Sequence, residues 1–227
     1  MAVTIDNTDI STYGAALLTF DPGMPEIANT YLHNVSMRNV RPIRLLGEIG
    51  LREIRLEIEV YGDTEPDAVT RMSNLCAAIR DGSELDVGDG FGYYYVVDSF
   101  SKPERVSRNW YTFSAILVGY RHGRTQTATY SKTGNLLVAG NYDAPAIFRI
   151  TKTSGTTFTV NGITYTGTSG AEDPVVVDGY ARTVMQSGQN VFGRMSMTAF
   201  PVLTPGANTI TITGTGTVAV EYQPIFM

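Results

Sequence analysis

The sequence contains few of the residues that build metal centres. Its 227 residues include one cysteine, Cys76, and two histidines, His33 and His122. One cysteine cannot form an internal disulfide, and a structural zinc site needs several Cys or His ligands. Cys76 falls within the apolar spacing of a helix candidate, so we interpret it as a small buried side chain. We expect no metal, no cofactor, and histidines at the surface or at a boundary of the fold.

Long apolar runs and runs of basic residues are also missing. No uncharged apolar stretch approaches the ~20 residues of a membrane-spanning helix, and the N-terminus MAVTIDNTDI has no signal-peptide pattern. The net charge is -5, and the acidic excess lies in the first 124 residues, with 12 basic and 17 acidic side chains. Phosphate binding normally needs basic clusters. We therefore expect no membrane insertion and no direct binding of nucleic acid.

Motifs for nucleophilic catalysis are missing as well. There is no Gly-x-Ser-x-Gly sequence, and the histidines have no partners in a recognisable order. A hydrolase of cell-wall glycan would need only two facing carboxylates, so it stays as an enzyme alternative. The carboxylates that could serve are Asp81, Glu84, Asp86 and Asp89, between the helix and the next strand, or Glu57 and Glu59 on the exposed face of a strand. Because glycines interrupt the first group, we interpret it as turns, and we interpret Glu57 and Glu59 as a solvated or subunit-facing strand surface. We therefore expect no enzymatic activity.

Two other sites could be imagined in this glycine-rich stretch. Residues 81–90 lack the regular alternation of an EF-hand and its twelfth-position glutamate, which argues against a calcium loop. Gly88, Gly90 and Gly92 precede an aromatic strand and not a helix, so no helix N-terminus is available to receive a phosphate. The sequence predicts neither a calcium site nor a phosphate loop.

The N-terminal half reads as strands around one helix. Apolar residues alternate from Arg52 to Val60, which predicts a half-buried strand with Arg55, Glu57 and Glu59 on its other face. An extended stretch at 35–46, carrying Arg38, Arg41 and Arg44, precedes a turn at 47–50, so the two strands suggest a long hairpin. Apolar spacing predicts a helix from Pro66 to Asp81. Strands at 91–98 and 110–120, joined by a loop at 99–109, complete the predicted domain of residues 1–124.

The C-terminal half reads as a β-sandwich. Gly, Thr and Ser dominate residues 125–142, which we interpret as a linker. Residues 143–227 contain short alternating runs with turn residues at sandwich-like intervals. Asn161-Gly162 between two such runs predicts a hairpin turn. The fold class is therefore mainly β: an N-terminal β domain with one α-helix and a long hairpin, followed by a β-sandwich.

One segment near the C-terminus combines a turn and a strand. Phe200-Pro201 is followed by Leu203, by Pro205-Gly206 and by an alternating strand that ends near Thr213. Pro205 presets the φ of a turn and Gly206 can take a positive φ. The spacing of Phe200 and Leu203 brings both toward the sandwich core, so we interpret the segment as scaffold and not as a binding motif.

This segment and residues 141–150, NYDAPAIFRI, resemble the C-terminal signature of distal tail proteins of siphovirus-type bacteriophages, the Dit family. The order of parts along the chain is similar as well. The resemblance implies a galectin-like or carbohydrate-module-like sandwich and a structural virion protein at the tail tip, assembled in the host cytoplasm. It also implies a homo-hexameric baseplate-hub ring between the tail tube protein and the tail-tip or receptor-binding proteins. DNA would pass through this ring without specific binding, and Arg55, Glu57 and Glu59 would contact neighbouring subunits.

A carbohydrate-binding adhesin is the alternative from another class. Its C-terminal sandwich would recognise a host cell-wall or capsular glycan through Tyr165, Tyr180 and Tyr222. Residues 143–227 contain no tryptophan, which weakens this alternative without excluding it. The Tyr93–Tyr95 run and Trp110 could form a sugar-stacking platform, but aromatic residues on alternating strands more often serve a core or a subunit contact.

Overall fold

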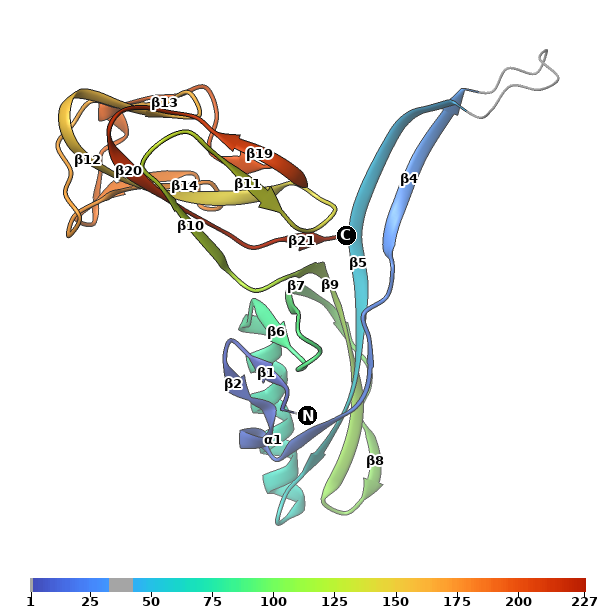
Figure 1. The fold of residues 1–227 in the computed structure, drawn as a ribbon. Helices are drawn as coiled ribbons and strands as arrows, with labels where there is room; N and C mark the ends of the chain where they lie inside the picture. The colour runs from blue at the N-terminus through green and yellow to red at the C-terminus, as the bar shows by residue number, and fades with distance from the viewer. Residues whose placement is uncertain (1, 33–42) are drawn as a thin grey trace. The chain divides into compact units, whose positions relative to one another are not determined.

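The computed structural model describes residues 2–32 and 43–227 (Figure 1). The chain divides into two compact units, residues 1–122 together with Met227, and Gly123–Phe226. Both are built mainly of antiparallel strands, as the fold class predicts. The helices found in the described ranges are all too short or too polar to cross a lipid bilayer.

The first unit is one antiparallel sheet with a helix on one face. The sheet has the order β2-β1-β6-β7-β9-β5-β3, while β4 pairs with β5 and β8 with β9. Its elements are β1 (Thr4–Ile5), β2 (Thr8–Asp9), the 3-10 helix η1 (Ile10–Tyr13), β3 (Ala15–Asp21), β4 (Pro25–Leu32), β5 (Ile43–Tyr61), α1 (Glu65–Asp81), β6 (Glu84–Asp86), β7 (Gly92–Phe100), β8 (Glu104–Ser107) and β9 (Trp110–His122).

The helix α1 begins and ends where the sequence predicts. Thr64 caps its N-terminus by accepting a hydrogen bond from the Asp67 N–H, Pro66 lies in the first turn, and Gly82 follows the last residue. Leu75 and Ile79 are fully buried against the sheet. The apolar stripe begins at Ala68, because Val69, which the sequence places in it, is 44% exposed.

The long hairpin is present, but its predicted turn is wrong. Residues 47–50 lie inside β5, where Gly47 pairs with Asn29 and Ile49 with Ile27 of β4. Because glycine also fits an extended backbone, Gly47 and Gly50 do not force a turn there. Most of the predicted strand at 35–46, including Arg38 and Arg41, lies outside the described residues.

The predicted loop at 99–109 contains a short strand. β8 pairs with β9, with Glu104 opposite Thr112 and Arg105 opposite Tyr111. Pro103 lies immediately before β8, so its missing N–H does not disturb the pairing. The loop prediction is therefore wrong for these four residues, and for residues 99–100, which belong to β7.

The second unit is a sandwich-like β unit whose main sheet has the order β10-β20-β12-β14-β15-β16. β11 and β19 form a separate two-stranded sheet. Its elements are β10 (Gln126–Tyr130), β11 (Gly134–Val138), β12 (Ala144–Val160), β13 (Ile163–Tyr165), β14 (Val175–Asp178), β15 (Thr183–Gln186), β16 (Gln189–Asn190), the 3-10 helix η2 (Phe192–Arg194), β17 (Met195–Ser196), β18 (Val202–Leu203), β19 (Gly206–Ile210), β20 (Ile212–Tyr222) and β21 (Ile225–Phe226).

The stretch that the sequence predicts to be a linker contains two paired strands. β10 pairs with β20, and β11 pairs with β19. Their Thr and Ser residues suit strands as well as loops, which explains why composition alone misplaces this stretch. Residues 126–130 and 134–138 belong to the second unit.

The predicted Asn-Gly turn joins β12 to β13. Asn161 and Gly162 both have positive φ, 47° and 78°, as a type I′ hairpin turn requires. The Asn161 side chain also accepts a hydrogen bond from the Thr211 N–H at 2.7 Å. The hairpin prediction is confirmed.

Candidate subunit-interface site

Arg55, Glu57 and Glu59 share one face of β5, opposite the core residues Leu56 and Ile58. This face points away from the side that α1 covers, because side chains alternate along a strand. The structure thus brings the three predicted residues into one row. We call the row, together with Glu53, the charged row of β5.

The charged row is only partly neutralised within the chain. The Arg55 Nε atom lies 2.6 Å from a carboxylate oxygen of Glu53, and the two side chains are 66% and 49% exposed. The Thr19 hydroxyl donates to Glu57 at 2.9 Å. A hydrogen bond with Glu59 raises the pKa of the Tyr61 hydroxyl. Exposed pairs of this kind contribute little to stability, which leaves the row available to a partner.

A shallow depression lies beside the charged row. Its volume is about 430 Å³, and its lining includes Arg55 and Glu57 of β5, Thr19 and Asp21 of β3, and Ser114 of β9. Leu56 and Ile116 also line it, so apolar surface lies beside hydroxyls and charges of both signs, a mixture that is typical of contacts between proteins. Sequence reasoning missed Thr19, Asp21 and Ser114, because their strands reach this face only through β3–β5 and β5–β9 pairing.

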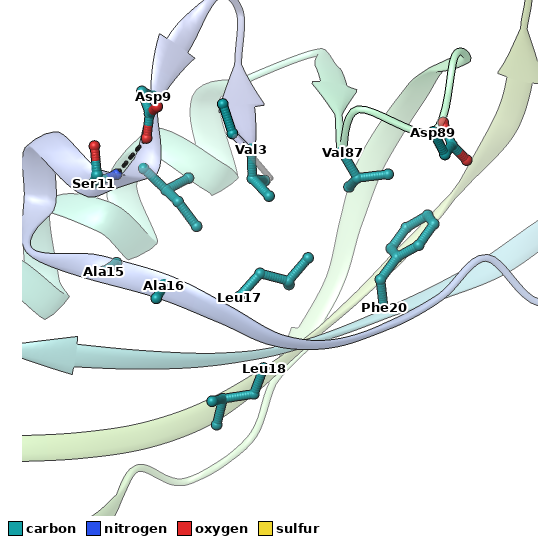
Figure 2. Close-up of a pocket in the computed structure, with 12 residues that line it drawn as sticks. Val3, Asp9, Ser11, Ala15, Ala16, Leu17, Leu18, Phe20, Val87 and Asp89 are labelled. Carbon is teal, nitrogen blue, oxygen red and sulfur yellow. Dashed lines mark hydrogen bonds between the residues drawn. The ribbon is translucent and has the colours of Figure 1, made fainter.

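A larger cavity of about 570 Å³ opens beside β3 (Figure 2). Figure 2 shows Leu17 and Phe20 of β3 pointing toward Val3 and Val87 across this space, with Asp9 and Asp89 at its ends. Val3 and Val87 are buried core residues, so the cavity reaches the edge of the hydrophobic core. No sequence signal indicates it, because its walls come from segments far apart in the chain.

The carboxylates proposed for a hydrolase are used in local structure. Asp86 accepts a hydrogen bond from Gly88 N–H, and Asp89 accepts one from Phe91 N–H and one from the Tyr93 hydroxyl. Burial, together with Asp89, raises the pKa of Tyr93. Asp81 pairs with Arg80. These contacts are the ones expected of turn carboxylates.

The other chemistry-bearing residues also fit structural roles. His122 is buried, against the expectation of a surface or boundary position: its ring stacks on Tyr94 and its Nε2 atom lies 3.2 Å from Glu84. Cys76 is only partly buried, and burial raises the pKa of its thiol, which keeps it protonated. His33 lies outside the described residues. The ranges 2–32 and 43–227 contain no group of three or more His, Cys, Asp or Glu side chains that could hold a metal ion.

Within the Phe200–Gly206 segment, Leu203 packs in the core. Leu203 is 1% exposed, whereas Phe200 is only partly buried and tilts against Phe192. The expectation that both reach the core therefore holds for Leu203 alone. The reason is pairing: β18 places Leu203 opposite Ala144 of the central strand β12, and Phe200 precedes this pairing.

Gly206 has a φ of 92°, as the turn interpretation predicts. The Asn208 side chain closes this turn: it accepts from Thr204 N–H at 3.1 Å and donates to the Thr204 carbonyl at 2.6 Å. Sequence reasoning missed this role of Asn208. An asparagine shortly after a Pro-Gly pair is the signal that could have found it, because Asn side chains often bond nearby backbone.

Two of the three tyrosines of the adhesin alternative are buried. Tyr165 is 0% exposed and donates to the Thr168 carbonyl, and Tyr222 is 4% exposed. Tyr180 is 37% exposed. A sugar-stacking surface needs exposed aromatic faces, so Tyr165 and Tyr222 cannot supply one in this structure. In the first unit Tyr93 and Tyr95 are buried, and Trp110 stacks on Tyr61.

Comparison with known proteins bears on the whole chain. Residues 139–226 match the family model described as "siphovirus-type tail component, C-terminal domain". The structure is similar to the crystal structure of the SPP1 Dit (gp 19.1) protein, with a TM-score of 0.73 and 13% sequence identity, over 100% of this chain and 99% of that chain. That protein is described as a paradigm of the hub adsorption apparatus in phages that infect Gram-positive bacteria.

Two structures of the phage P2 baseplate in its activated conformation contain a similar chain. The one with Ca matches with a TM-score of 0.60 and 10% identity, over 98% of this chain and 96% of that chain. The one with Sr matches with a TM-score of 0.57 and 10% identity, over 97% and 96%. The comparison with curated proteins gives no match. The resemblance noted in the sequence is confirmed: residues 139–226 match the model of the siphovirus-type tail component, C-terminal domain, and the chain as a whole has the fold of a Dit protein.

Proposed function

We propose that this chain is the distal tail protein of a siphovirus-type phage, a structural baseplate-hub component at the tail tip. The observation that carries the proposal is the fold likeness to SPP1 Dit, which extends over both units and leaves almost no part of either chain unmatched. The family match of residues 139–226 supports it independently, because it comes from sequence and not from shape.

We further propose that the first unit builds a homo-hexameric ring. A closed ring needs a heterologous contact, in which one patch meets a different patch on the next copy. The charged row of β5 carries unlike charges that complementary groups on a neighbour would satisfy. The ring would join the tail tube protein to tail-tip or receptor-binding proteins, after assembly in the host cytoplasm, and would surround the DNA exit channel.

The proposed role is structural and not enzymatic. An acidic first unit suits a DNA conduit, because phosphates do not adhere to a wall that repels them. Asp86 and Asp89 of the hydrolase alternative accept hydrogen bonds that close local turns, which supports a structural role for them. The adhesin alternative loses two of its three proposed tyrosines to the core, so we do not retain it.

Native mass spectrometry of the purified full chain tests the proposal. Six copies of the 24.7 kDa chain give a mass of about 148 kDa. We expect a closed species of this mass that persists on dilution, without a series of larger open oligomers. A monomer at every concentration that keeps the protein soluble would overturn the ring.

A further inference from the structure

The turn between β12 and β13, Asn161-Gly162, is a dipeptide that can react with itself. Every other asparagine of the sequence precedes a residue with a side chain, and Asn161 alone precedes glycine. Because glycine has no Cβ to hinder the approach, its backbone nitrogen can reach the side-chain carbon Cγ of the preceding asparagine. Both residues are exposed, so water has access to the turn.

The reaction available to this pair is deamidation. The Gly162 nitrogen loses its proton and forms a bond to Asn161 Cγ, the Cγ–Nδ2 bond breaks, and the amide nitrogen leaves as ammonia. Water then opens the resulting succinimide ring at one of its two carbonyl carbons. One product is aspartate, and the other is isoaspartate, in which the main chain runs through Cβ and Cγ. Water is the only co-reactant.

The folded turn opposes closure of the ring. The φ values of Asn161 and Gly162, 47° and 78°, are those of a type I′ turn. This turn is the mirror image of type I, so the ψ of its first central residue is roughly +30°. A succinimide ring forces the ψ of the asparagine to a strongly negative value. The turn must therefore open before the Gly162 nitrogen can attack.

Thr211, between β19 and β20, holds the Asn161 side chain in place. Asn161 N–H donates to the Thr211 carbonyl at 3.0 Å, and Asn161 Oδ1 accepts from Thr211 N–H at 2.7 Å. These two bonds, which we call the Asn161–Thr211 clamp, continue the ladder in which Val160 pairs with Ile212. A rotation that presents Cγ to Gly162 breaks the bond to Oδ1, so the clamp adds a cost to the attack.

Core residues of the second unit flank the clamp. Val160 and Ile163, on either side of the turn, are 0% and 3% exposed, and Ile210, just before Thr211, is 0% exposed. Val160 also pairs with both Ile163 and Ile212. Opening the turn disturbs these buried pairs, so the open state is a minor population of the folded chain.

We propose that Asn161-Gly162 is a latent deamidation site, which the folded second unit keeps closed through the type I′ turn and the Asn161–Thr211 clamp. Modification follows local opening of the β12–β13 hairpin, so its rate measures how often this part of the second unit opens. The inference goes beyond the proposed function, because it concerns the chemistry of one turn and not a contact with other tail proteins.

The two products have different consequences for the fold. Aspartate keeps a side-chain oxygen that can accept from Thr211 N–H, and it tolerates a positive φ, so the clamp persists. Isoaspartate places Cγ and its oxygen in the main chain and adds a carbon atom to the backbone of a two-residue turn. Val160 and Ile163 then lose their common register, although both belong to the core. Isoaspartate, and not aspartate, should therefore destabilise the second unit.

Peptide mapping by mass spectrometry measures the reaction. The full chain is kept folded in buffer and, in a matched sample, unfolded in guanidinium chloride at the same pH and temperature. We expect Asn161 to deamidate at least about tenfold faster in the unfolded sample. Asn135 and Asn208, which precede Leu and Thr, are internal controls and should react slowly in both. Equal rates at Asn161 would overturn the role of the fold, and no reaction in either sample would overturn the site.

A pair of variants tests the clamp itself. Thr211→Pro removes the N–H that donates to Asn161 and keeps the carbonyl that accepts from it, at a strand boundary where proline is tolerated. Thr211→Val keeps both backbone groups and is the matched control. Loss of one hydrogen bond should raise the deamidation rate of the folded chain roughly fivefold in the proline variant alone. A folded proline variant that reacts at the parent rate would contradict the clamp.

Hydrogen exchange of the parent chain gives a test that needs no variant. Guanidinium chloride below the unfolding transition should raise the deamidation rate of Asn161 and the exchange rate of the Thr211 amide by the same factor, because one opening exposes both. Rates that respond independently would contradict the proposal.

Thermal melts of the separated products complete the test. Asn161→Asp, which reproduces the aspartate product, should melt like the parent, whereas the isoaspartate fraction of an aged sample should melt at a lower temperature. An isoaspartate fraction that melts like the parent would contradict the structural role given to this turn.

Discussion

Leu203 should be a larger contributor to the stability of the second unit than Phe200. Leu203→Ala removes three carbon atoms from a side chain that is 1% exposed. At about 0.8 kcal/mol per buried methylene, the lost burial is roughly 2.4 kcal/mol. Incomplete collapse of the site raises the total to about 3 kcal/mol. Phe200 is only partly buried, so we expect about 1–1.5 kcal/mol for Phe200→Ala.

Two spectroscopic probes can follow this change in the full chain. Far-UV circular dichroism monitors both units, whereas fluorescence monitors the first alone, since Trp110 of β9 is the only tryptophan. For a domain of this size, about 3 kcal/mol lowers the melting temperature by roughly 15 °C. Leu203→Ala should therefore shift the circular dichroism transition of the second unit and leave the Trp110 transition in place.

Three outcomes would refute this reasoning. Leu203→Ala could melt like the parent, Phe200→Ala could cost as much as Leu203→Ala, or the Trp110 transition could shift by the same amount as the second unit. The first would place Leu203 outside the core. The second would place Phe200 in the core, and the third would show that the two units unfold together.

Four further predictions concern two individual residues, the roles of the two units and the absence of hydrolysis. Gly206→Val should lower the free energy of unfolding by about 1–2 kcal/mol, measured by thermal melts. The cause is the positive φ alone, because no atom lies within 4 Å of the added Cβ. Gly206→Asn should cost less, since asparagine tolerates a positive φ better than valine. Burial raises the pKa of Asp6, but hydrogen bonds from Glu84 N–H, Ser83 N–H and the Ser83 hydroxyl together lower it by more, so the folded-state pKa lies below its usual value. Asp6→Ala should therefore destabilise the protein above pH 4, and this effect should disappear as the pH falls below the folded-state pKa. Equal urea midpoints of parent and variant at pH 7 would contradict this prediction. A fragment of residues 1–124 should form rings while a fragment of residues 123–227 stays monomeric, and light scattering that gave the reverse would exchange the roles of the two units. Purified peptidoglycan and capsular polysaccharide should release no reducing ends with or without divalent ions, and release that stops on changing Glu84, Asp86 or Asp89 to alanine would restore the hydrolase alternative.

Local patterns were sufficient to predict the elements whose signals lie within a few residues. The helix carries its own cap at Thr64 and its own stop at Gly82, and Asn161-Gly162 encodes its turn in two residues. The alternation from Arg52 to Val60 predicts which side of β5 is buried. These signals depend on backbone chemistry and on the spacing of apolar residues along the chain. They can be read without knowing which strands lie next to one another.

Features that depend on distant pairing could not be predicted in this way. The turn assigned to residues 47–50 fails because pairing with β4 holds both glycines in an extended strand. Composition suggests a linker at 125–142, yet β20 and β19 supply partners for two strands there. The burial of Tyr165 and Tyr222 and the cavity beside β3 also arise from packing between segments that are far apart in sequence.

Imaging the purified full chain by electron cryo-microscopy tests the central claim most directly. The account predicts closed rings with six-fold symmetry, built by the first unit around a channel wide enough for duplex DNA. It also predicts that the charged row of β5 lies at a contact between neighbouring copies. Monomers, open filaments, or rings built by the second unit would contradict the claim that this chain is a ring-forming hub of a phage tail.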